Sequence, residues 1–417
     1  MLDTAGPRAD NYRECWGRDG EGRLNRQSSE STDVTAAYED FGLDSDHVEF
    51  RRQFRRFVAD RVSPLAKRGE NDKRFPLEIY GLLREAGYLA INYPEAIGGA
   101  GGDLLMGCLF YEELTRASAG VSAGVFAHQH LALAPIIALG TAEQKAEFGR
   151  PAIEARRIGA FGLTEPDAGS DIRGIRTTAR RDGDDFVLNG SKLYITNGTI
   201  ADFMLIAART GQARAADSLS IFIVETADAG IATSNLDKIG NHSSSTALVS
   251  IADVRVPRHR VLGEIGGGLT QLKATLTDGR ILVANRGLGL AQEALELVLG
   301  YARARQAFGQ TIGKFQGVAF KIAHLAAQVD AARLMIYRAA RLRMSGRDCT
   351  REASMAKLLA SEIAVRATSD ALLLHGGAGY MHEMKIAQLY RDAPEAWIGE
   401  GTNEIQLHVI ARSLELL

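Results

Sequence analysis

Cysteine is scarce in this sequence of 417 residues: Cys15, Cys108 and Cys349 are the only three, far apart and odd in number. This spacing argues against a disulfide framework and provides no CxxC pair for a metal or redox site. A reducing compartment fits best, and we expect a cytoplasmic protein without a bound metal.

An excess of positive charge and long hydrophobic runs are also missing. The 49 Lys and Arg residues face 51 Asp and Glu residues, which leaves a formal net charge of -2 and no global basic field for nucleic acid or anionic lipid. Charge, Gly or His interrupts every apolar stretch before the roughly 18 residues that a membrane span needs. The sequence therefore predicts neither a nucleic-acid partner nor a membrane-spanning segment.

The N-terminal part lacks the marks of a targeting segment. It has no apolar core for secretion, and acidic residues are scattered among its arginines, unlike in a transit peptide. Its few apolar residues show no periodicity, so ordering them would cost backbone entropy with little burial in return. We predict that residues 1–42 form a flexible extension.

Proline is rare and unevenly spread, since eight of the nine prolines lie at or before Pro257 and the last is Pro394. A proline inside a helix removes a hydrogen bond and clashes with the preceding turn, so the gap between these two permits long helices. Apolar residues recur there every three or four positions in the segments 268–309, 315–344 and 351–380. Together with a last helix after Gly401, they predict a four-helix bundle over residues 265–417.

The rest of the chain divides into two further regions. Residues 158–264 hold short runs rich in Val, Ile, Phe, Tyr and Thr, separated by Asn, Gly, Asp and Ser, which is typical of short strands. Residues 43–157 show helical spacing, with Gly-rich loops such as IGGAGGD between the helices. We predict a multidomain α+β fold with a helical domain, a barrel-like β domain and the bundle. No GxGxxG opens a helix after a strand, so a Rossmann site is not indicated.

Two segments of the β region carry polar candidates. FGLTEPDAGSD, residues 161–171, offers closely spaced N–H groups and hydroxyls that suit a polar ring edge or a phosphate. On residue types alone a plain loop is the favoured alternative. SKLYITNG, residues 191–198, closes a strand with an aromatic beside Thr and Asn, and core packing plus a turn is its alternative.

Two more candidates lie in the bundle. YARARQAFGQTIGKFQ, residues 301–316, places Arg305, Phe308 and Gln316 around a break between two helices. An arginine beside an aromatic can bind phosphate while the ring covers an apolar face, and a charge at a helix C-terminus is the alternative. LLHGGAGY, residues 373–380, has paired glycines that permit close backbone approach or simply stop a helix.

Glu400 lies between Gly399 and Gly401, just ahead of the last predicted helix. A carboxylate at this position can cap the helix N-terminus. Alternatively, a carboxylate at the mouth of an apolar cavity is desolvated, and its raised pKa lets it act as a base on a weak carbon acid.

In their order and spacing, these motifs resemble the acyl-CoA dehydrogenase family. The resemblance covers about residue 45 to the end and rests on PEAIGGAGG, LTEPDAGSD, ITNG, RQAFGQTIGKFQ, LHGGAGY and EGTNEIQ. It implies an N-terminal helical domain, a middle β domain and a C-terminal four-helix bundle, with FAD bound between the last two.

The resemblance also implies two groups of FAD contacts. The first group is Phe161, Leu163, Thr164, Gly169, Ser170, Tyr194, Ile195 and Thr196, with Thr402, Asn403 and Glu404 at the start of the last helix. The second group, expected to reach the FAD of a neighbouring subunit, is Arg305, Phe308, Gln316, Leu373, Leu374, His375, Gly376 and Gly377. Such sharing implies a homo-oligomer, usually a tetramer.

The activity implied is FAD-dependent α,β-dehydrogenation of an acyl thioester, carried on coenzyme A or a carrier protein, to the trans-2-enoyl thioester. Glu400 matches the catalytic base, which removes the α-proton while the β-hydrogen passes as hydride to flavin N5. A ribityl hydroxyl and the N–H of Glu400 are expected to polarise the thioester carbonyl. An electron-transfer flavoprotein is the expected acceptor. The alternative is an oxygen-using flavoenzyme of the same superfamily, an acyl-CoA oxidase or a flavin-dependent monooxygenase.

Several positions bear on the substrate. The residues that match substrate-proximal positions are Ser170, Thr277, Asp278, Arg280 and Gly401. Some family branches place the base one residue before this arginine, but that residue is Gly279 here, which favours Glu400. Gly399 replaces an aromatic that walls the pocket in many members. Asp278 leaves a polar or branched acyl group open, and a salt bridge within the bundle is an equal alternative for Arg280.

Overall fold

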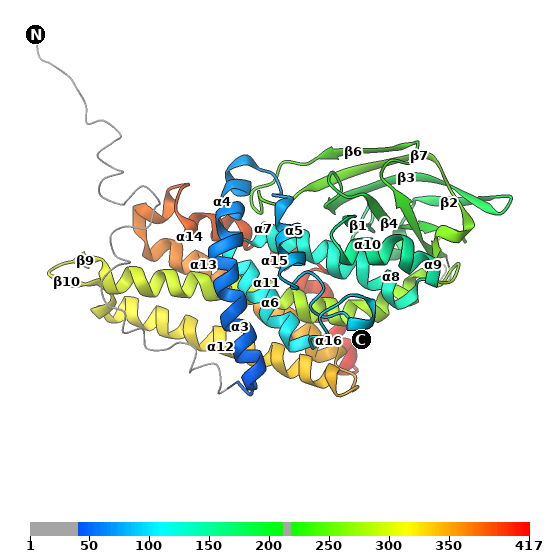
Figure 1. Ribbon diagram of the computed structural model, residues 1–417. Helices are drawn as coiled ribbons and strands as arrows, with labels where there is room; N and C mark the ends of the chain where they lie inside the picture. Colours follow the sequence, from blue (N-terminus) through cyan, green and yellow to red (C-terminus); the bar gives the residue numbers. More distant parts are fainter. Residues whose placement is uncertain (1–40, 212–217) are drawn as a thin grey trace, which may run out of the picture.

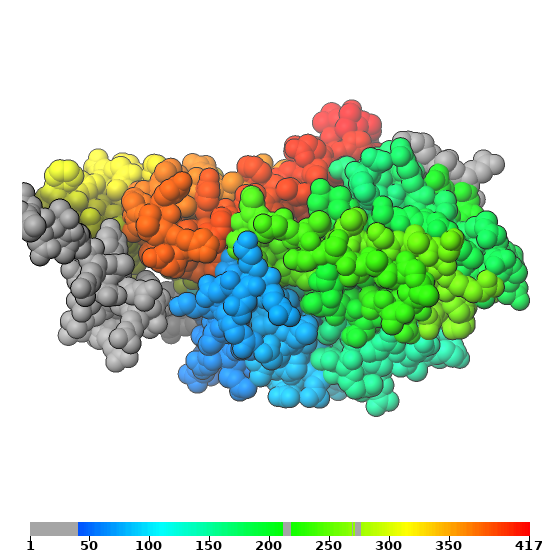
Figure 2. Space-filling model, turned by 90° about the horizontal axis from the view of Figure 1, so that it is seen from above, coloured from blue at the N-terminus to red at the C-terminus, as the bar shows by residue number. Residues whose placement is uncertain are grey.

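The computed structural model describes residues 41–211 and 218–417, so nearly all of the predicted extension lies outside the described residues. Three regions follow one another along the chain: helices, a sheet, and a second set of helices (Figure 1). The predicted α+β fold class is confirmed. Seen from above, the green sheet region lies at one end, the blue N-terminal helices in the middle, and the yellow and orange parts of the bundle at the other end (Figure 2).

The N-terminal region consists of short helices with polar caps. Asp44 starts the first helix by accepting the N–H of His47 at 2.9 Å, and Asp103 accepts the N–H of Met106 at 2.9 Å at the start of the longest one. The helices are α3 (Ser45–Phe57), α4 (Ser63–Asp72), α5 (Glu78–Glu85), α6 (Leu104–Ala117), α7 (Ala119–Phe126), α8 (Ala134–Leu139), α9 (Ala142–Gln144) and α10 (Arg150–Ile153).

The stretch Ala119–Leu139 is long and apolar enough to cross a membrane by length and composition. It comprises α7, a π-helical segment at Ala127–Leu133, and α8, with 21 residues and a mean hydropathy of 1.3 in its most apolar part. Gly and His interrupt this stretch, so a count of uninterrupted apolar residues did not predict it. Its mean hydropathy stays high because Gly and His lower that mean less than charged residues do. Of that part 72% is buried inside the molecule, as in the core helix of a folded domain.

The middle region forms one sheet. Its strands are β1 (Gly159–Gly162), β2 (Thr178–Asp182), β3 (Asp185–Thr196), β4 (Phe203–Arg209), β5 (Leu219–Glu225), β6 (Ile231–Asn235), β7 (Thr246–Val256) and β8 (Val261–Leu262). They pair in the order β6-β7-β3-β2-β4-β5-β8, with β1 parallel to β4. This order has free ends at β6 and β8, so the described strands do not close into a barrel. Alternate residues such as Leu188 and Val249 are buried in the sheet core.

The four long predicted helices of the C-terminal region are present: α11 (Gly268–Ala304), α12 (Gln316–Met344), α13 (Thr350–Leu374) and α16 (Asn403–Ser413). A small hairpin of β9 (Gln306–Ala307) and β10 (Gln310–Thr311) joins α11 to α12. Two short helices that the sequence did not predict, α14 (Lys385–Asp392) and α15 (Glu395–Ile398), precede α16.

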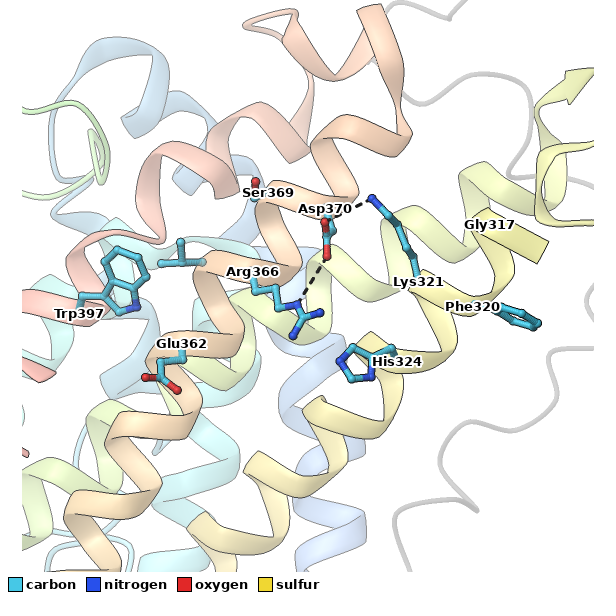
Figure 3. Close-up of a pocket in the computed structure, with 10 residues that line it drawn as sticks. Gly317, Phe320, Lys321, His324, Glu362, Arg366, Ser369, Asp370 and Trp397 are labelled. Atoms are coloured by element: carbon cyan, nitrogen blue, oxygen red, sulfur yellow. Dashed lines mark ion pairs between the residues drawn. The ribbon is translucent and has the colours of Figure 1, made fainter. Parts of the chain in front are cut away.

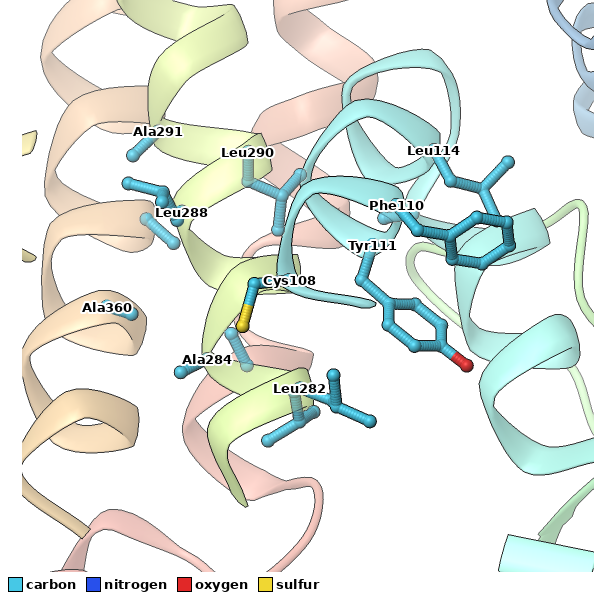
Figure 4. Packing of buried hydrophobic residues seen from close by; sticks show 14 of the residues in the cluster. Cys108, Phe110, Tyr111, Leu114, Leu282, Ala284, Leu288, Leu290, Ala291 and Ala360 are labelled. Carbon is cyan, nitrogen blue, oxygen red and sulfur yellow. The ribbon is translucent and has the colours of Figure 1, made fainter. Parts of the chain in front are cut away.

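Helix α6 packs directly on the bundle. Cys108 of α6 points toward α11 beside Ala284, Leu288 of α11 points toward Ala360 of α13, and all four side chains are buried (Figure 4). Because one core continues from the N-terminal helices into the bundle, replacing Leu288 by Ala would remove about 2–5 kcal/mol of stability from both regions together.

Candidate active site

The two polar segments predicted in the middle region lie side by side. Leu193 donates its backbone N–H to the carbonyl oxygen of Thr164 at 2.9 Å. Strand β1, which holds Phe161, ends just before Thr164. The segments 161–171 and 191–198, separated in sequence, therefore form one continuous site.

A β-bulge turns the end of β3 outward at Tyr194. The register slips between Lys192 and Ile195, so the two residues between them oppose a single residue of β7. Tyr194 has a φ of 62°, and its side chain is 66% exposed. Bulges commonly re-aim side chains beside active sites, and this one presents an aromatic ring next to the polar segment.

A buried ion pair supports these segments from behind. Lys192 lies 2.8 Å from Glu165 and also donates to the carbonyl oxygen of Leu163 at 3.1 Å. The Glu165 carboxylate accepts the N–H groups of Arg176 at 2.6 Å and Thr177 at 2.9 Å. Burial lowers the pKa of Lys192 to about 8, against the opposing charge of Glu165. Sequence reasoning missed both residues, although each lies inside a motif.

The other predicted flavin residues of this region differ in exposure. Phe161, Leu163, Thr164 and Thr196 are half-buried, and Gly169 and Ser170 are exposed. Ile195 is only 3% exposed and packs in the sheet core. Its side chain is therefore directed away from a ligand, and only its backbone is available for contact.

Glu400 adopts a left-handed backbone conformation, with φ of 55°, and Gly401 follows with φ of 89°. For a residue with a side chain this conformation costs about 1–2 kcal/mol, and it persists where the surroundings impose it, often at functional sites. The capping alternative for Glu400 is wrong, because Thr402 is the N-cap of α16 and its hydroxyl accepts the N–H of Ile405 at 3.4 Å. The Glu400 carboxylate is left for another role.

Neighbouring helices hold the segment around Glu400. Lys357 of α13 donates from Nζ to the carbonyl oxygen of Trp397 at 3.2 Å and to Oδ1 of Asn403 at 3.0 Å. Gln406 of α16 donates to the carbonyl oxygen of Glu400 at 3.4 Å. Asn403 therefore uses its side-chain oxygen within the protein, and Glu404 beside it is exposed.

The Glu400 carboxyl is poised for proton transfer near neutral pH. Burial raises its pKa to about 7, and the negative charge of Glu395 acts in the same direction. The positive charges of Arg286, Arg280 and Lys357 oppose this shift without cancelling it. A pKa close to the working pH is what a general base requires.

Gly279 of α11 lies beside that carboxylate. A Cβ atom at Gly279 would lie 3.8 Å from Oε2 of Glu400 and 3.0 Å from Nε2 of His130. The Glu400 carboxylate and the His130 imidazole therefore both lie beside Gly279. His130, on the π-helical segment Ala127–Leu133, was not singled out from the sequence.

Among the predicted substrate residues, Asp278 and Arg280 differ sharply. Asp278 accepts from Nε of Arg343 at 2.5 Å and from Nη2 at 3.1 Å, so it forms a salt bridge within the bundle. Arg280 forms no such pair in the described part of the chain: its Nε is buried without a hydrogen-bond partner, and burial lowers its pKa while Glu400 raises it. Thr277 is half-buried in the same turn of α11.

The second group of predicted flavin residues gathers at the far end of the bundle. His375 stacks on Tyr301 with ring centroids 4.3 Å apart, which joins the C-terminal ends of α13 and α11. Phe308, in the adjoining hairpin, has a φ of 50° and is 96% exposed. Arg305, Gln316, Leu373, Gly376 and Gly377 are exposed as well, whereas Leu374 is half-buried.

This group is distant from Glu400 within one chain. Arg280 and Ala304 are 24 residues apart on α11, which corresponds to about 36 Å along the helix axis. The residues near Glu400 and those around Arg305 are therefore two separate half-sites.

A groove of about 670 Å³ lies on the outer face of α12 and α13. Lys321 and Arg366 both approach Asp370, each at 3.8 Å, and Trp397 lies at its edge (Figure 3). Neither Glu400 nor the segments 161–171 and 191–198 line this groove. It is therefore separate from the candidate active site.

The donor chemistry of both half-sites fits FAD. Around Thr164, hydroxyls and backbone N–H groups alternate with apolar side chains and the exposed Tyr194 ring, which suits a flat ring with a polar edge. At the far end, the exposed guanidinium of Arg305 and the exposed ring of Phe308 suit a phosphate and a base. Within residues 41–211 and 218–417, no group of three or more His, Cys, Asp and Glu side chains is arranged to hold a metal ion.

Comparisons with known proteins identify the family of the chain. The acyl-CoA dehydrogenase N-terminal domain matches residues 44–156, the middle domain residues 160–254 and the C-terminal domain residues 266–415. A probable acyl-CoA dehydrogenase of Bacillus subtilis, YngJ, is 40% identical over 376 residues, which is 90% of this chain and 99% of that protein.

Two further relatives extend the comparison. Subunit CarC of the caffeyl-CoA reductase-Etf complex of Acetobacterium woodii is 38% identical over 83% of this chain and 91% of its own length. The structure of butyryl-CoA dehydrogenase from Megasphaera elsdenii superimposes with a TM-score of 0.86 at 36% identity, covering 89% of this chain and 99% of that one. With its three domains matched in order, the chain belongs to the acyl-CoA dehydrogenase family and is an FAD-dependent oxidoreductase acting on CH–CH groups.

Proposed function

We propose that Glu400 is the base with which this FAD-dependent dehydrogenase removes the α-proton of its acyl thioester substrate. The observation that carries the proposal is the position of its carboxylate, beside Gly279 on a strained loop, with a pKa raised by burial to about 7. An acyl α-hydrogen is only weakly acidic, and a desolvated carboxylate is a stronger base than one in water.

The chain's own residues divide the remaining work. We assign the backbone N–H of Glu400 to the thioester carbonyl, where it would stabilise the charge that develops as the α-proton leaves. The helices that hold the loop, through Lys357 and Gln406, keep the base in one geometry. When bound, FAD supplies the redox chemistry by accepting the β-hydrogen with its electron pair.

The substrate side of the site is assigned by the groups near the base. We assign Arg280 and His130 to the acyl thioester, because both approach Glu400 and Arg280 keeps a buried N–H without a partner. We keep Ser170, Thr277 and Gly401 as proposed substrate contacts. Ser170 is exposed, and Thr277 and Gly401 are half-buried. Asp278 is left out, because its carboxylate is already paired with Arg343.

The far half-site is proposed to serve a second subunit. Arg305, Phe308 and Gln316 are exposed at the far end of the bundle, and α11 runs about 36 Å from Arg280 to Ala304 beside them, so we propose that they reach the FAD of a neighbouring copy. We therefore propose a homo-oligomer, and a tetramer as its form. In this proposal each FAD site needs residues from two chains. A variant that prevents assembly is therefore expected to lose FAD as well.

An electron-transfer flavoprotein is the proposed acceptor, and the cytoplasm the proposed location. The relative from Acetobacterium woodii is a subunit of a caffeyl-CoA reductase-Etf complex, which supports this acceptor. Oxygen as acceptor is the competing outcome.

The experiment is anaerobic bleaching of the flavin against a panel of acyl thioesters, each presented on coenzyme A and on a carrier protein. Bleaching by at least one substrate, together with slow reoxidation in air, supports a dehydrogenase. Fast reoxidation with release of hydrogen peroxide would instead show an oxidase. Absence of bleaching by every acyl thioester would contradict the proposed function.

A further inference from the structure

The glycine before the base makes room for a second carboxylate. A Cβ atom at Gly399 would meet Oε1 of Glu395 at only 2.4 Å, closer than real Cβ atoms approach another atom. The backbone of Gly399 is also tied to Glu395, because its N–H donates to the Glu395 carbonyl oxygen at 2.9 Å. The side chain of Glu395 therefore folds back over the residue that precedes Glu400.

An arginine of the bundle fixes this carboxylate in place. Nη2 of Arg286 lies 3.0 Å from Oε2 of Glu395, and the same nitrogen donates to the carbonyl oxygen of Ala119 at 3.4 Å. The Arg286 side chain is only 6% exposed, whereas that of Glu395 is 40% exposed. Oε2 of Glu395 is therefore held by Arg286 of α11, and Oε1 lies against Gly399.

The charges around Glu400 come from three helices. They are Glu395 on α15, Arg280 and Arg286 on α11, and Lys357 on α13, with the imidazole of His130 nearby at Gly279. Burial opposes ionisation of the base, and Glu395, as the negative member of this set, adds to that effect. A like charge at short range favours the protonated form of a carboxyl, and the positive groups favour the ionised form.

Taking the proposed role of Glu400 as given, we propose that Glu395, clamped by Arg286, is a positioning residue that sets the proton affinity of the base. Glu395 strengthens Glu400 as a base by its charge, and Arg286 limits that effect by neutralising part of it. Neither residue needs to touch the substrate. Gly399 is needed for this position of Glu395, because any larger side chain at residue 399 would occupy the space of the Glu395 carboxylate.

The test compares the FAD-bound wild type with Glu395→Gln, which keeps the shape and the hydrogen-bond acceptor but removes the charge. Difference infrared spectroscopy follows the carbonyl stretch of the protonated Glu400 carboxyl, identified by its loss in Glu400→Gln, across pH. We expect the titration midpoint to fall by about one pH unit in Glu395→Gln. Arg286→Gln should raise it, and Arg286→Lys should restore it.

Glu362→Gln is the matched control, because it removes an equal charge from an exposed position on α13. Its midpoint should equal that of the wild type. Equal midpoints in the wild type and Glu395→Gln, with normal flavin bleaching, would overturn this inference alone. Absence of bleaching by any acyl thioester in the wild type would instead overturn the proposed function.

Discussion

Arg333 donates from Nη1 to both carboxylate oxygens of Glu112, at 2.7 and 2.6 Å, and neither side chain is exposed to solvent. Arg51 of α3 donates to the same carboxylate at 2.7 Å. Burial alone would raise the pKa of Glu112, but the two guanidinium groups hold it well below its usual range. This network joins α3 and α6 to α12, and so fastens the N-terminal helices to the C-terminal helix bundle.

We predict that Glu112→Gln lowers the free energy of unfolding by about 3–5 kcal/mol, because it removes the buried negative charge to which the guanidinium groups of Arg51 and Arg333 donate. Chemical denaturation followed by circular dichroism measures the loss. Glu49→Gln is the control, since Glu49 pairs with Arg52 on the exposed face of α3 and such pairs contribute little. Equal stability of the two variants would contradict this role for the network.

Arg305→Ala should release FAD and weaken assembly together, because an exposed guanidinium at the far half-site is proposed to hold the cofactor of a neighbouring subunit. The ratio of flavin to protein absorbance and the sedimentation coefficient measure the two effects. Arg303→Ala removes an equally exposed charge two positions earlier and should change neither. A fully flavinated oligomer of Arg305→Ala would count against a shared site.

The pH dependence of kcat/KM should follow the ionisation of Glu400. Only the ionised carboxylate can accept a proton, and its pKa is raised to about 7, so activity should increase as pH rises through neutrality. One unit below this pKa, kcat/KM should be about a tenth of its plateau value. Stopped-flow measurement of flavin reduction gives the profile. A rate that falls as pH rises through this range would assign the base to another group.

Gly399→Ala should move the same profile toward lower pH. The added Cβ would meet Oε1 of Glu395 at 2.4 Å, so the carboxylate must withdraw from the base loop and its 3.0 Å contact with Arg286 must lengthen. Gly300→Ala is the control, because nothing lies within reach of a Cβ there and alanine favours the helix by about 0.5–1 kcal/mol. Identical profiles for Gly399→Ala and the wild type would argue against a role for this contact.

The fold could be predicted because its strongest signals are local. The stretch between Pro257 and Pro394 permits long helices, and α11, α12 and α13 occupy it. Short runs rich in Val, Ile, Phe, Tyr and Thr identified β3 and β7 in the same way. The short helices α14 and α15 were missed, because they have only 8 and 4 residues and show too few periods to be recognised.

The site was only partly predictable, because its geometry depends on contacts between residues far apart in sequence. Glu400 could be singled out from its flanking glycines, but the contact of Glu395 with Arg286, across 109 positions, exists only after the helices pack. The bulge that exposes Tyr194 likewise depends on the register between β3 and β7. His130 could not be singled out, because no pattern in the sequence around it points to a site. Its position beside Gly279, close to Glu400, is seen only in the folded structure.

The most direct test of the account is anaerobic mixing of Glu400→Gln with an acyl thioester that bleaches the flavin of the wild type. Because Gln cannot accept a proton, the variant should bind FAD normally, judged by its flavin spectrum, while its flavin reduction slows by at least about a hundredfold. Near-normal bleaching by Glu400→Gln would contradict the assignment of Glu400 as the base.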